Sequence, residues 1–234
     1  MATGAPMGTI TPPSTGRSIT TMSTDPILTL TQWLSPGFPV GAFAYSHGLE
    51  TAIAAEGIRN IKQLDEWLRD LIVFGSGRAD TILLAAAYRA DPAELAEIDE
   101  TARAFAASAE RLLETTQQGA AFAQTVNAVW GTELDELTYP VAVGAAARAR
   151  TIPLDLTARL YLQAFTANLI SAAVRLVPLG QTEGQALLAE LAPLIEDTAA
   201  EAIDTPLHGL SSTCFAADIA AMHHETLYSK VFRT

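Results

Sequence analysis

The sequence predicts an all-α fold: a single-domain bundle of eight to ten helices around one buried central helix. Two observations favour this fold class. Alanine is very frequent, and Val, Ile and Thr occur in short scattered groups rather than in the alternating runs typical of strands. Apolar residues also recur at steps of three and four along several segments, which is the spacing of one helical face.

Two parts of different composition make up the chain. Residues 1–24 are rich in Thr, Ser, Pro and Gly and lack an apolar core segment, which predicts a disordered N-terminal tail rather than a signal peptide. Residues 25–234 contain no further boundary. With 234 residues, of which 49% are hydrophobic, the chain is long enough for one domain with a substantial core.

Capping residues mark the helix starts in the first half of the chain. Asp25 precedes Pro26, a pairing typical of an N-cap followed by the first helical position. Asn60 is expected to cap another helix, with Gln63 placed to bond back to the cap. Asp91 and Pro92 form the same pair of an N-cap aspartate and a proline at the first helical position. The helices expected from these and similar signals are 26–34, 48–55, 61–74, 80–90, 91–118 and 120–130.

Prolines mark expected helix starts in the second half of the chain. Pro140 and Pro153 are each expected to begin a helix. The helix 153–177 would be roughly 37 Å long at 1.5 Å per residue. Its apolar residues lie on nearly all sides, so we expect it to be the buried central helix. Two more helices are expected, at 182–203 and 206–228.

Charge and cysteine content exclude several classes of protein. A net charge of −12 would be repelled by nucleic-acid phosphates and anionic lipid headgroups. The same charge would attract basic partners or cations, or would only keep an apolar protein in solution. The most apolar uncharged run, between Arg159 and Arg175, is 15 residues long, short of the ~20 residues that a bilayer requires. Cys214 is the only cysteine, so nothing indicates an oxidising compartment, and a cytoplasmic protein is expected.

The residue spacings of several known catalytic and metal-binding motifs do not occur in this sequence. No histidine follows a glutamate by three residues, as a carboxylate-bridged di-metal bundle requires. The zincin pattern begins at His224-Glu225 but has Tyr228 where its second histidine belongs. No glycine is followed by lysine, so there is no phosphate-binding P-loop, and no Gly-x-Ser-x-Gly occurs. Cys214 stands in an apolar stretch typical of the core. The sequence therefore predicts a protein that catalyses no reaction.

Two polar groups and an unusual chain end remain. His47 and Glu50 are spaced to face the same way, and a hydrogen-bonding role is favoured over a metal site. His223 and His224 are adjacent and cannot share a helical face, which argues against a two-histidine metal site within one chain. This reasoning does not exclude a metal site formed between two copies of the chain. The final residues carry an apolar stripe, which either packs on the chain's own core or binds a partner. The stripe consists of Leu227, Tyr228, Val231 and Phe232.

Three separated stretches of the chain form recognisable motifs. Residues 34–50 read L-S-P-G-F-P-V-G-A-F-A-Y-S-H-G-L-E, residues 175–181 read R-L-V-P-L-G-Q, and residues 224–233 read H-E-T-L-Y-S-K-V-F-R. These stretches resemble the UreF family of urease accessory proteins. The resemblance covers about residues 27–234 in the same order. Thr138, Lys230 and Thr234 depart from the residues usual in the family, and lysine cannot reproduce a bidentate arginine contact.

The resemblance implies an all-α, dimerising, non-catalytic protein without a cofactor. It implies binding to the accessory protein UreD, also called UreH, recruitment or regulation of the GTPase UreG, and nickel insertion into apo-urease by the assembly. The residues expected to dock with UreD are Glu225, Tyr228, Phe232 and Arg233. Those expected to shape the dimer or the surface facing the GTPase are Tyr45, His47, Glu50, Arg175 and Gln181. The alternative is a nickel-binding carrier that uses dimer-related histidines.

Overall fold

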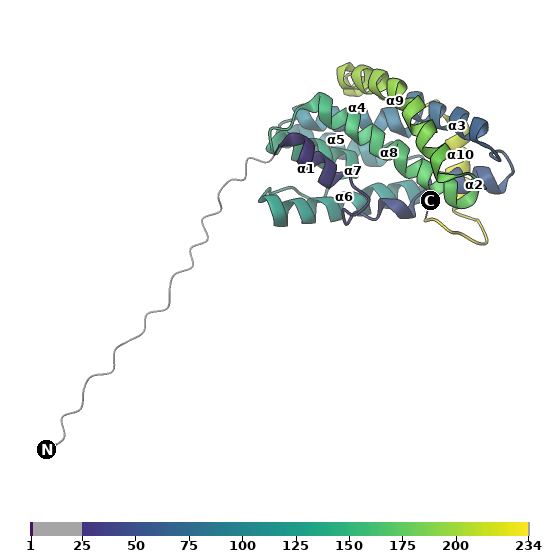
Figure 1. The fold of residues 1–234 in the computed structure, drawn as a ribbon. Helices are drawn as coiled ribbons and strands as arrows, with labels where there is room; N and C mark the ends of the chain where they lie inside the picture. The colour runs from purple at the N-terminus through teal and green to yellow at the C-terminus, as the bar shows by residue number, and fades with distance from the viewer. Residues whose placement is uncertain (2–24, 234) are drawn as a thin grey trace.

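The described part of the computed structural model, Met1 and residues 25–233, is a helical bundle without strands (Figure 1). The predicted disorder of the N-terminal tail concerns residues that, apart from Met1, lie outside this part. The helices are α1 (Pro26–Trp33), α2 (Leu49–Ala54), α3 (Ile61–Val73), α4 (Ser76–Arg89), α5 (Pro92–Ala104), α6 (Ala109–Trp130), α7 (Tyr139–Ala149), α8 (Leu154–Leu176), α9 (Gln181–Asp204) and α10 (Phe215–His224). Short 3-10 turns occur at Ala42–Ala44 and Leu207–Gly209.

The predicted caps are present. The Asp25 carboxylate accepts a hydrogen bond from the amide of Ile27 at 2.8 Å, at the start of α1. Asn60 accepts from the amide of Gln63 at 3.1 Å at the start of α3. At α5, Asp91 forms a complete capping box with Glu94. Each cap satisfies amides that a helix leaves without intrahelical partners, so these local signals determine where the helices start.

Helix α4 packs against α3, α5, α7, α8 and α9. Nine of its fourteen residues are buried. The sequence indicated instead that the helix 153–177 was buried on nearly all sides. The observed α8 does bury one face, which includes Leu162 and Leu169, but Leu160, Ala164 and Ala167 on its other side are only half-buried. The bundle therefore has a buried central helix, and that helix is α4.

Three predicted boundaries were wrong. Helix α4 begins at Ser76, not at Asp80, because residues 76–79 continue the helix after Gly75. Helix α6 runs through Gly119, and the break between α5 and α6 lies at residues 105–108. Helix α10 is confined to residues 215–224, because residues 210–214 are non-helical and the amide of Thr213 donates to the carbonyl of Phe74 at 2.9 Å.

One stretch, Ile61–Arg89, is long and apolar enough to cross a membrane by length and composition alone. It comprises α3 and α4, and 67% of its most apolar window is buried inside the bundle. Core helices of globular proteins are typically apolar in this way. The burial of these two helices therefore accounts for their composition.

Candidate functional site: a docked C-terminal tail

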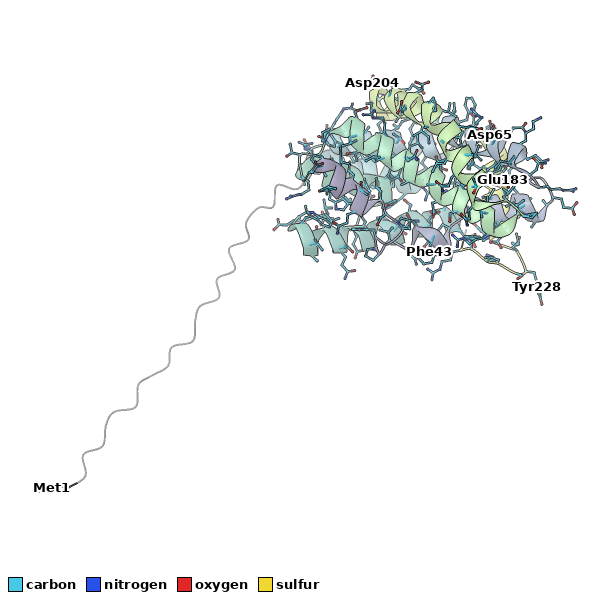
Figure 2. The ribbon with its side chains drawn as sticks, in the orientation of Figure 1. Met1, Phe43, Asp65, Glu183, Asp204 and Tyr228 are labelled. Carbon is cyan, nitrogen blue, oxygen red and sulfur yellow. The ribbon has the colours of Figure 1, made fainter. Side chains whose placement is uncertain are left out.

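Residues 225–233, here called the tail, leave α10 and return to the bundle near α2 without forming a helix (Figure 1). Their apolar residues divide between the core and the surface. Phe232 is 4% exposed and belongs to the hydrophobic cluster that also contains Leu49 and Leu169. Tyr228 and Val231 are exposed, and Tyr228 projects outward from the loop (Figure 2). The tail thus packs on its own core through Phe232, leaves Leu227 half-buried, and presents Tyr228 and Val231 to solvent.

Glu50 holds the end of the tail through its backbone. Its carboxylate, buried in the first turn of α2, accepts hydrogen bonds from the amide of Val231 at 2.7 Å and from that of Phe232 at 2.9 Å. Burial by itself raises the pKa of Glu50, but these two amides and His224 outweigh it and lower the pKa below its ordinary value. The sequence placed Glu50 on a dimer or GTPase-facing surface, whereas in this structure it contacts the tail.

His224, at the end of α10, is fully buried between two carboxylates. Its Nε2 lies 3.1 Å from an oxygen of Glu50, and its Nδ1 lies 2.6 Å from an oxygen of Glu110 on α6. The second oxygen of Glu110 accepts from Lys230 Nζ at 2.6 Å. We call Glu50, His224, Glu110 and Lys230 the tail clamp. It joins α2, α6, α10 and the tail through charge-assisted contacts.

The close approach of α2 to α10 makes this geometry possible. Gly48 precedes α2 with a φ of 77°, a conformation that glycine adopts without strain. A Cβ atom on Gly48 would lie 2.7 Å from the backbone nitrogen of Ala221 and 3.0 Å from the carbonyl oxygen of Ala217. Only glycine therefore lets Glu50 reach His224.

Further contacts fix the rest of the tail. The amide of Arg233 donates to the carbonyl of Ala44 at 2.7 Å, and the hydroxyl of Tyr45 donates to Gln117 at 3.1 Å. Burial raises the pKa of Tyr45, and the nearby side chain of Arg233 opposes this. Arg175 lies 5.1 Å above the ring of Phe232, a cation–π contact. Glu225 accepts from the amide of Ala109 at 2.8 Å at the start of α6, where the helix dipole favours negative charge.

His47 belongs to a separate group. Its Nε2 lies 3.1 Å from Glu114 on α6, and Arg111 reaches both Glu114 at 3.3 Å and Asp80 of α4 at 2.6 Å. Burial raises the pKa of Glu114, but His47 and Arg111 outweigh it and lower the pKa. We call His47, Asp80, Arg111 and Glu114 the buried charge cluster. His47 and Glu50 thus make hydrogen-bonded contacts between elements, each with a different partner.

The structure brings most of the predicted site residues into one place. Tyr45, Glu50 and Arg175, which the sequence assigned to a different surface, all contact the tail. Gln181 is the exposed first residue of α9 and makes none of the tail contacts described above. The partner-binding roles of all these residues stay predictions.

Sequence reasoning missed Glu110, Lys230 and the cluster residues other than His47. One signal was available. Glu110 and Glu114 are like charges at i and i+4 on one helix, an arrangement that destabilises an exposed helix and calls for cationic partners elsewhere. Lys230 and Arg111 supply those partners.

No group of three His, Cys, Asp or Glu residues within the described part of the chain is arranged to hold a metal ion. Both ring nitrogens of His224 face carboxylates, and Nε2 of His47 does so as well. Nickel binding by dimer-related histidines stays an untested alternative.

The lowered pKa of Glu50 predicts that tail docking weakens in acid. A carboxyl group whose folded-state pKa is lowered stabilises the docked state fully above its unfolded pKa of about 4.3. That stabilisation is lost as the pH falls through the lower folded pKa. Amide hydrogen exchange between pH 6 and pH 3 is expected to show falling protection of Val231 and Phe232 at the acid end. Protection that stays constant over this range would contradict the assignment.

The fold and the site define an all-helical protein whose C-terminal tail is docked and presents exposed aromatic and aliphatic side chains. The UreF family profile matches residues 58–192. A urease accessory protein UreF of Roseobacter denitrificans is 62% identical over 213 residues, 91% of this chain and 96% of the relative. Those of Cereibacter sphaeroides and Ruegeria pomeroyi are 54% and 50% identical over 209 residues, 89% of this chain, and 98% and 96% of their own lengths. The chain belongs to the UreF family of urease accessory proteins.

Proposed function

We propose that this chain is a non-catalytic scaffold for urease maturation. In this proposal it acts in the cytoplasm as a homodimer, binds a UreD/UreH-type protein through its tail, and recruits the GTPase UreG. The assembly then inserts nickel into apo-urease. GTP hydrolysis resides in the partner in this proposal, which agrees with the lack of a P-loop sequence in this chain.

The exposure of Tyr228 and Val231 on a docked tail is the observation that carries this proposal. The tail is anchored at residues 225, 230, 231, 232 and 233 by the contacts described above. Ordering these residues before binding reduces the entropy lost when a partner docks. Aromatic residues are enriched among the side chains that dominate binding energy at interfaces. A held segment that exposes such side chains is therefore suited to protein recognition.

A second apolar surface lies on α10. Phe215, Ile219 and Met222 are spaced at i, i+4 and i+7 on one face of this helix, and all are exposed. They border a cavity of about 360 Å³ that α4 and the segment before α6 also line. Contiguous exposed apolar surface typically marks an interaction site. Helix α10 leads directly into the tail, which supports a binding surface that includes both.

The double substitution Tyr228→Ser with Val231→Ser is expected to weaken UreD binding by at least about 30-fold, the loss of one strong interface contact. Both side chains are exposed, so the melting temperature is expected to stay unchanged. The test is co-expression with UreD and UreG from the same host, followed by size-exclusion chromatography with light scattering.

Val129→Ser is the matched control, because Val129 is another exposed aliphatic residue, near the end of α6 and outside the tail. It is expected to leave the complex intact. A double variant that still co-elutes with UreD would show that the tail surface is not the binding site. The double substitution is more informative than Phe232→Ala, because Phe232 is buried and its loss would disturb the docking of the tail itself.

A further inference from the structure

We propose that Glu50 and His224 are positioning residues that fix the register of the C-terminal tail, and thereby decide which of its side chains face a partner. The claim about register stands on contacts within this chain. Its consequence for a partner rests on the proposed function.

The carboxylate of Glu50 fixes the register of the tail, because it pairs with two successive backbone amides. Its Oε1 accepts the amide of Val231 and its Oε2 accepts that of Phe232. The two side chains that follow these amides point opposite ways, since Val231 is 71% exposed and Phe232 is 4% exposed. A shift of one residue could place Val231 in the pocket of Phe232 and would move Phe232 out of it. The pairing with Glu50 therefore selects the side chain that is buried.

His224 holds Glu50 in the orientation that this pairing requires. The imidazole is buried and contacts the same Glu50 oxygen that accepts the amide of Phe232. Its other nitrogen contacts Glu110, so the ring bridges α2 and α6. The charged groups that face it are these two carboxylates, with Lys230 on the far oxygen of Glu110. Removing one member leaves buried charges without their partners.

The clamp also determines where Tyr228 lies. Glu225 and Lys230, on either side of Tyr228, both attach to the first turn of α6 through the amide of Ala109 and the carboxylate of Glu110. The intervening loop is thus held at both ends on one helix terminus. Release of Lys230 would free the loop on one side. Tyr228, which makes no packing contact that buries it, would then lose its fixed position.

Amide hydrogen exchange on the isolated, full-length chain tests the register claim without any partner. In Glu50→Gln, one of the two amides meets a side-chain N–H instead of an acceptor oxygen. Protection of Val231 and Phe232 is expected to fall at least about tenfold, with no comparable change in α4. The residual protection is also expected to lose the acid dependence of the parent chain, which a purely structural contact would not alter.

Glu114→Gln is the matched control, since Glu114 is also a buried glutamate paired with a histidine, His47, and lies outside the tail clamp. It is expected to lower overall stability while protection of the tail relative to α4 stays unchanged. Equal tail protection in Glu50→Gln and the parent chain would overturn the proposal. If Glu50→Gln does not fold, His224→Gln tests the register through the fall in protection of Val231 and Phe232 alone, because it keeps the Glu50 carboxylate.

Binding to UreD separates the two proposals. Loss of tail protection together with weaker UreD binding in Glu50→Gln supports both. Loss of protection with unchanged UreD binding confirms the register claim and overturns the tail as the docking surface. Unchanged protection overturns the register claim whatever the binding result, and the Tyr228→Ser and Val231→Ser variant then decides the proposed function alone.

Discussion

Replacing Arg111 by methionine is expected to lower the free energy of unfolding by about 3–5 kcal/mol, the usual cost of removing one partner from a buried ionic group. Arg111 is the cation between two buried acids, with its side chain 13% exposed and those of Asp80 and Glu114 10% and 2% exposed. Methionine fills a similar volume but leaves both carboxylates with less compensating charge. Tyr161, which donates to Asp80 at 3.1 Å, and His47 do not replace it fully.

Arg69→Met is the control for this prediction. Arg69 also pairs with an aspartate, Asp65, but both side chains lie at the surface of α3, at 44% and 27% exposed. An exposed pair of this kind contributes about 0–1 kcal/mol. Urea unfolding followed by circular dichroism gives both values. A loss below about 1 kcal/mol for Arg111→Met would show that the cluster does not hold α4 and α6 together.

The buried charge cluster also bears on the tail, because Arg111 follows Glu110 in the first turn of α6. Arg111 fixes this turn against α4 through Asp80, while Glu110 attaches to His224 and Lys230. The core of the bundle and the tail clamp therefore share one helix terminus. Arg111 is therefore the cluster residue whose substitution is expected to reach the tail, because it adjoins Glu110 in this turn.

Local signals in the sequence predicted most of the fold. Capping by Asp25, Asn60 and Asp91, and the prolines at the starts of α7 and α8, depend on residues within a single helical turn, so they can be recognised from the sequence alone. The boundaries that failed depend on distant contacts. Residues 210–214 are held out of helix by the pairing of Thr213 with Phe74, 139 positions away, which no local pattern encodes.

The site was predicted in its residues but not in its arrangement. The motifs named Tyr45, Glu50 and Arg175, yet their contacts with the tail join positions far apart in the chain, as Glu50 and His224 do at 174 positions. Whether Phe232 is buried depends on the pocket that these distant elements create. Sequence alone left that question open, and the structure answers it by burying Phe232 and exposing Val231.

Substituting Gly119 by alanine is expected to destabilise the protein by roughly 3 kcal/mol or more, at the upper end of the cost of overpacking. Gly119 was expected to end a helix, but it lies in the middle of α6, where alanine by propensity alone would stabilise by about 0.5–1 kcal/mol. The close contact with the segment at the start of α7 makes the substitution destabilising instead. A Cβ atom at position 119 would lie 1.9 Å from the carbonyl oxygen of Leu137 and 2.8 Å from the amide nitrogen of Tyr139, both backbone atoms that cannot rotate away.

The matched control is Ala120→Gly, the reverse change at the next position, which is half-buried. It is expected to cost about 1 kcal/mol through helix propensity. Thermal and urea unfolding of both variants separate helix propensity from overpacking. Propensity alone would stabilise Gly119→Ala and destabilise Ala120→Gly, whereas overpacking destabilises Gly119→Ala. If Gly119→Ala proved more stable than the parent chain, α6 and α7 would not pack as closely as the structure shows. A large loss would instead explain why glycine stands inside this helix: it lets the backbone before α7 lie directly against α6, which positions α7 beside α4.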